Sequence, residues 1–64
     1  MEKVEKGQIV KIKNNEILSI MGVPVATGVV QSIHTDGNGF SFKCDQTNAI
    51  ETADFGDGEL TILG

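Results

Sequence analysis

The stretch from Gly22 to Cys44, GVPVATGVVQSIHTDGNGFSFKC, constrains the fold more than any other part of this chain. A run rich in β-branched residues leads into the cluster Asp36-Gly37-Asn38-Gly39, and a Phe-x-Phe alternation follows it. Glycine and asparagine tolerate the positive φ angles that tight hairpin turns require. The stretch is therefore predicted to form a β-hairpin.

Two registers are compatible with this turn. A Gly37-Asn38 loop pairs Ile33 with Phe42, whereas an Asn38-Gly39 loop pairs Ile33 with Cys44. Since side chains alternate along a strand, both registers give the same two faces. The predicted core face carries Ile33, Phe40, Phe42 and Cys44, and the predicted solvent face carries Ser32, His34, Ser41 and Lys43.

The same alternation extends backwards along the first hairpin strand. It places Val25 and Val29 on the core face and Val30 on the opposite face. Val30 then requires a bulge, a second covering layer or an interface. Gly28 is a candidate position for a bulge or a bend.

A chain of 64 residues forms one small domain, in which residues 1–6 are expected to be a flexible arm and residues 7–64 a single β domain. The fold class is predicted to be all-β, with about five short antiparallel strands in an SH3-like small barrel or a meander. Apolar positions at strand spacing define the expected core: Val10, Ile12, Val25, Val29, Ile33, Phe40, Phe42, Leu60 and Ile62.

The remaining segments are assigned by the same patterns. The segment Glu16–Met21 fits helical spacing, but its short length and β-branched content favour an extended loop or short strand. Residues 45–53 fit either a short strand or one helical turn. Residues 54–58, DFGDG, form a second turn cluster with Phe55 turned inward, and residues 59–64 form the last strand.

Catalytic, metal and cofactor sites are not expected. Cys44 is the single cysteine, which excludes an intrachain disulfide, and His34 is the single histidine. The acids Asp54, Asp57 and Glu59 do not follow the spacing of a calcium loop. The chain is therefore predicted not to be an enzyme. It shows no signal peptide and no apolar span, so we expect a cytoplasmic protein outside the membrane.

The formal charge of −4 is unevenly distributed. Residues 1–32 hold four Lys against three Glu (+1), and residues 33–64 hold one Lys against six acids (−5). The chain contains no arginine, which argues against general binding of phosphate backbones. A protein partner with a basic surface is the better electrostatic match.

A family resemblance rests on Gly7–Ile12 (GQIVKI), Gly28–Gly37 (GVVQSIHTDG) and Phe40–Phe42 (FSF). These segments resemble the opening of SH3-like small barrels of the KOW type, in which a Gly-x-x-Val strand precedes a Gly-Val-Val-x-x-Ile strand and a tight hairpin. The resemblance implies a small barrel and a family that often binds nucleic acid, RNA polymerase or ribosomal partners. It assigns no functional residue to this chain.

The leading function hypothesis is a small binding module that docks a protein partner as a regulator or inhibitor, through an edge strand or its acidic loops. Self-association is a closely related hypothesis, and a nucleic-acid-associated accessory protein is the alternative. Lys11 and Lys13 form a candidate electrostatic patch. The candidate interface consists of apolar residues beyond the predicted core: Ile17, Leu18, Ile20, Met21, Val30 and Leu63.

Overall fold

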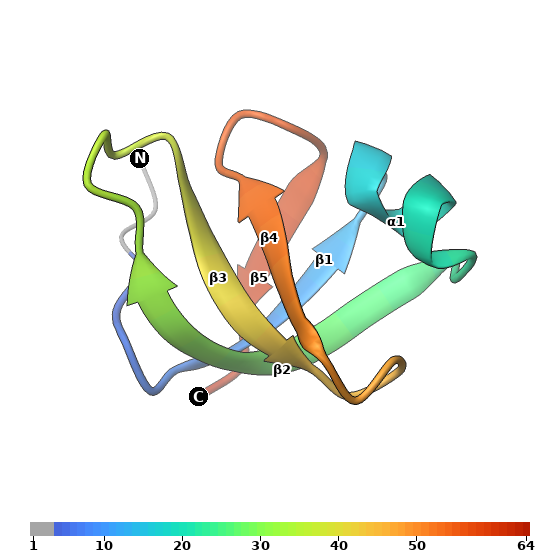
Figure 1. Ribbon diagram of the computed structural model, residues 1–64, viewed down its shortest axis with the longest axis horizontal. Helices are drawn as coiled ribbons and strands as arrows, with labels where there is room; N and C mark the ends of the chain where they lie inside the picture. The colour runs from blue at the N-terminus through green and yellow to red at the C-terminus, as the bar shows by residue number, and fades with distance from the viewer. Residues whose placement is uncertain (1–3) are drawn as a thin grey trace.

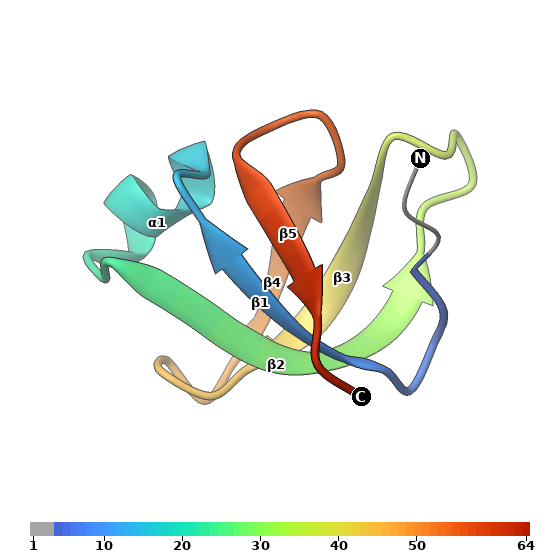
Figure 2. The same ribbon diagram turned by 180° about the vertical axis from the view of Figure 1, so that it is seen from behind.

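The computed structural model describes residues 4–64 and contains one five-stranded antiparallel sheet in the order β4-β3-β2-β1-β5 (Figure 1). Its elements are β1 (Ile9–Lys13), α1 (Glu16–Met21), β2 (Val25–Ile33), β3 (Gly39–Cys44), β4 (Ile50–Asp54) and β5 (Glu59–Ile62). The predicted all-β class with five short antiparallel strands is confirmed. Figures 1 and 2 show that the sheet curls, so that β4 and β5 lie on opposite sides of the molecule and α1 lies at one flank.

The hairpin of β2 and β3 forms as predicted, but both predicted registers are wrong. Ile33 pairs with Phe40, and the connection is wider than two residues. Inside it the Gly37 amide donates to the His34 carbonyl at 3.0 Å, and the Asn38 amide donates to Asp36 Oδ1 at 2.9 Å. The side chain of Asp36 thus stabilises a turn within a longer loop, which alternation of the flanking strands could not indicate.

A β-bulge in β2 decides which valine is buried. Val30 pairs with Phe42 and Ser32 pairs with Ser41, so Gln31 is the additional residue. The bulge turns Val30 into the core, at 1% exposure, and leaves Val29 outside at 37%. The prediction of Val29 in the core is wrong. Of the three alternatives for Val30, the structure shows the bulge and not an interface, because an extra residue reverses the side-chain phase.

Gly28 is not the bulge. It lies in the middle of β2 between Val10 and Cys44, where a Cβ atom would overlap the carbonyl oxygen of Lys43. The glycine is therefore required for close approach of two backbones.

The core is small, and four of the nine predicted core residues are buried in it: Val10, Ile12, Phe40 and Phe42. Its buried members are Val4, Val10, Ile12, Leu18, Ala26, Val30, Phe40, Phe42, Cys44 and Ala53. Leu60 and Ile62 pack against it half-buried, Val25 is also half-buried, and Ile33 is 38% exposed, contrary to prediction. Phe55 turns inward as predicted, with its ring centroid 5.2 Å from that of Phe40.

Within the expected flexible arm of residues 1–6, Val4 packs into the core. Residues 1–3 lie outside the described residues, but Val4 is buried at 6% exposure. The Gly7 amide donates to the Val30 carbonyl at 2.9 Å, which attaches this segment to β2. Residues 4–64 contain no helix with the length and apolarity needed to cross a bilayer.

The segment Glu16–Met21 is a helix, so the predicted loop or short strand is wrong. Asn15 caps its N-terminus, since Asn15 Oδ1 accepts from the Ile17 amide at 2.9 Å. Gly22 ends it with φ 75°, and the amides of Gly22 and Val23 both donate to the Leu18 carbonyl. A capping asparagine and a left-handed glycine stop thus stabilise a helix of only six residues.

Candidate functional site

The predicted interface residues do not form one surface. Four of them lie on α1, where Ile20 is 77% exposed, Leu18 is buried at 5%, and Ile17 and Met21 are half-buried. Val30 is in the core, so neither Leu18 nor Val30 is available to a partner. Leu63 is 56% exposed but lies beside the C-terminus, at the opposite end of the molecule from α1 (Figures 1 and 2).

The predicted electrostatic patch lies on the outer face of β1. Lys11 is opposite Thr27 of β2 and Thr61 of β5. Lys13 is opposite Glu59 of β5, so an acidic residue stands beside one of its two lysines. This arrangement makes the patch less basic than its lysines alone suggest.

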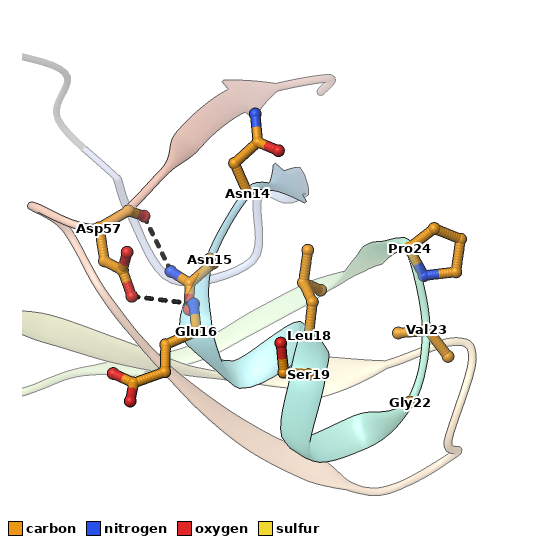
Figure 3. A pocket seen from close by; sticks show the side chains of 9 residues that line it. All are labelled: Asn14, Asn15, Glu16, Leu18, Ser19, Gly22, Val23, Pro24 and Asp57. Atoms are coloured by element: carbon orange, nitrogen blue, oxygen red, sulfur yellow. Dashed lines mark hydrogen bonds between the residues drawn. The ribbon is translucent and has the colours of Figure 1, made fainter.

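The N-terminal end of α1 is hydrogen-bonded to the connection between β4 and β5 (Figure 3). Asn15 Nδ2 donates to the backbone oxygen of Asp57 at 2.9 Å, and the Glu16 amide donates to Asp57 Oδ2 at 2.9 Å. Asn15 is 7% exposed and has a hydrogen bond at both side-chain polar atoms. Two segments more than 40 residues apart in sequence are therefore held in one position.

Three shallow depressions meet at this end of the molecule. The first, of about 620 Å³, lies over α1 and extends from Asn14 to Pro24, with Leu18 and Ser19 pointing toward it (Figure 3). The second, of about 140 Å³, separates α1 from β4, and its walls include Ile17, Ile20, Thr52, Ala53 and Asp54. The third, of about 710 Å³, is lined by Glu16, Asp36, Asn38, Asp54, Gly56 and Asp57.

We call the carboxylates of Glu16, Asp36, Asp54 and Asp57 the acidic end. All three depressions share Glu16 and Asp57, and none of their lining residues is basic. The four carboxylates come from α1, the β2–β3 loop, β4 and the β4–β5 connection. No group of three or more potential metal ligands occurs among residues 4–64. Because carboxylates and no basic residues line these depressions, the acidic end can attract cationic groups beside apolar side chains.

The free edge of β4 borders the second depression. The Phe55 amide donates to the Asn38 carbonyl and the Cys44 amide donates to the Ala49 carbonyl. In an antiparallel pair, every second residue of a strand hydrogen-bonds to its neighbour, so residues 51 and 53 of β4 also bond to β3. The backbone polar groups of Ile50, Thr52 and Asp54 therefore point away from β3, at the terminal strand of the sheet.

His34 and Cys44 contribute to none of these depressions. His34 Nε2 lies 3.2 Å from Ser41 Oγ on the β2–β3 hairpin. Cys44 is a free thiol, fully buried in the core as its predicted face requires, with Sγ 3.4 Å from Gln46 Oε1.

Sequence reasoning missed Asn15 and Asp57 as the pair that organises this end. A signal for the helix was present, because asparagine precedes the apolar residues of 17–21 and glycine follows them. No local signal connects Asn15 to Asp57, since their contact depends on the return of the chain through β4. Comparison with protein-family models, with curated proteins and with solved structures found no match for this chain.

Proposed function

We propose that this protein is a non-enzymatic binding module that docks a protein partner with a basic surface at the acidic end. The observation that carries the proposal is the second depression, which we call the groove between α1 and β4. There Ile20 is 77% exposed beside Asp54 and Asp57. A largely exposed isoleucine bordered by carboxylates suits a partner that offers an apolar side chain among lysines or arginines.

Further observations support a docking role over catalysis. The lone histidine lies on the hairpin and lines none of the three depressions, which are shallow and share an acidic lining. The KOW-type resemblance of residues 7–42 stays part of the proposal, and the five-stranded antiparallel sheet is compatible with it. We place the module in a reducing cytoplasm, where the free thiol of Cys44 persists.

The test is partner capture by the immobilised protein, with single substitutions at exposed positions. Ile20→Ser and Asp54→Asn should each reduce capture of the same partner, since Ile20 supplies apolar contact and Asp54 supplies charge. Leu63→Ser is the matched control, because Leu63 is 56% exposed at the far end of the molecule. Unchanged capture by Ile20→Ser and Asp54→Asn would contradict the proposal.

Two other modes are separated by the same assay. Capture that is lost after nuclease treatment and falls steeply with salt would indicate nucleic acid instead. Capture of a second copy, with melting that depends on protein concentration, would indicate self-association.

A further inference from the structure

We propose that the free edge of β4 binds an extended segment of the partner by strand addition, with basic and apolar side chains alternating along that segment. This inference rests on the proposed function and states how the acidic end recognises its partner. It is carried by the backbone geometry of β4 together with the side chains on its two faces.

The hydrogen-bonding capacity lies in the backbone of β4. The polar groups of Ile50 and Thr52 point away from β3, and β4 is the last strand on its side of the sheet. The strand sequence IETAD contains no lysine or proline, two residue types that natural edge strands use to prevent pairing. An added strand would therefore find donors and acceptors at the normal strand spacing.

The side chains of β4 define what the added strand should carry. Ala53 is buried and faces the interior, and it shares a depression with Ile17 and Ile20 of α1. The opposite face carries Ile50, Thr52 and Asp54, all exposed. The half-buried Glu51 shares the inner face with Ala53, where its carboxylate accepts a hydrogen bond from Thr47 Oγ1. Since neighbouring strands place their side chains in register, the partner strand puts apolar side chains toward α1 and basic side chains beside Asp54.

Charge favours a basic segment over an acidic one. Asp54 and Asp57 line both the groove and the neighbouring depression that contains Asp36, and no basic residue lines either. An acidic strand would bring like charges together, which costs free energy. The occupant is therefore an extended, lysine- or arginine-rich segment with small or β-branched apolar residues at alternate positions.

The probe is a blocked heptapeptide that alternates lysine and valine, titrated into the whole protein and followed by amide chemical shifts. The amides of Ile50 and Thr52 should shift and gain protection from hydrogen exchange. Thr52→Pro removes one edge donor at a position where an edge strand tolerates proline, and should weaken binding about five- to tenfold. Thr52→Val keeps the amide and should bind like the parent protein.

Two N-methylated peptides give an independent readout. One is methylated on its valines and the other on its lysines, so that each blocks one edge of the peptide strand. Strand addition predicts that one peptide loses binding at least tenfold while the other retains it. Equal retention or equal loss by the two peptides, or no shift of β4 amides at millimolar peptide, overturns strand addition.

The two proposals fail in different ways. If Ile20→Ser and Asp54→Asn reduce partner capture while the N-methylated peptides bind alike, docking at the acidic end stands and strand addition is wrong. If those substitutions leave capture unchanged, the docking site itself is wrong.

Discussion

Replacing Asn15 with alanine should destabilise the protein through two separate hydrogen bonds. Asn15 Oδ1 accepts from the Ile17 amide and Nδ2 donates to the Asp57 carbonyl, both at 2.9 Å. Loss of an asparagine N-cap costs about 1 kcal/mol. Loss of the second bond, from a residue that is 7% exposed, costs about another 1 kcal/mol.

The expected loss is therefore about 2 kcal/mol of unfolding free energy. For a domain of this size that corresponds to a decrease in Tm of roughly 8 to 16 °C. The measurement is thermal and urea denaturation followed by circular dichroism, with the m-value checked so that midpoints can be compared. In a small domain with a thin margin of stability, this loss is readily measured.

Two further variants separate the contributions. Asn15→Ser keeps a good N-cap but is too short to reach Asp57, so it should lose about 1 kcal/mol, half the effect of alanine. Asp57→Ala removes only the bond to the Glu16 amide, because Asn15 bonds to the Asp57 backbone. A loss below about 0.5 kcal/mol for Asn15→Ala would refute the claim that Asn15 ties α1 to the β4–β5 connection.

Three other predictions follow from the core, from Gly28 and from the acidic end. Phe42→Ala, at a fully buried position, should lose about 3 to 5 kcal/mol and abolish cooperative melting, and a variant that melts like the parent protein would contradict this. Gly28→Ala should lose about 1 to 3 kcal/mol in urea denaturation, because its Cβ would overlap the Lys43 carbonyl oxygen. Gly56→Ala, which meets nothing within 4 Å, is the control and should stay within about 0.5 kcal/mol of the parent. Calcium, zinc and chelators should leave Tm unchanged, since residues 4–64 contain no group of three metal ligands, and a rise of several degrees with either metal would show that a site exists.

Side-chain alternation and turn residues were enough to predict β1, β2, β3 and β5 and the buried face of β3, whereas the segment that contains β4 was left open between a strand and a helical turn. Phe40, Phe42 and Cys44 are all buried, as the alternation along β3 requires. The two glycine-rich clusters do form the connections at the ends of β2 and β4. These features depend on residues close together in sequence, where period-two spacing and backbone sterics act directly.

The sequence predicted only part of the candidate groove. The edge strand and the acidic loops were expected to provide the contact surface, but the residues between them were not identified. Ile20 was named as an interface residue and is exposed, whereas Leu18 and Val30 were named and are buried. Their burial depends on which strand or helix covers them, and a local pattern does not contain that information.

Tertiary structure alone decided the phase of β2 and the position of α1. The bulge at Gln31 exchanges the environments of Val29 and Val30, although both are β-branched and equally suited to a core. The bond between Asn15 and Asp57 joins residues 42 positions apart, and both residues line the groove. The sequence determined which segments extend and turn because those preferences are local, whereas burial and the groove arise from contacts between distant segments that form only when the sheet curls.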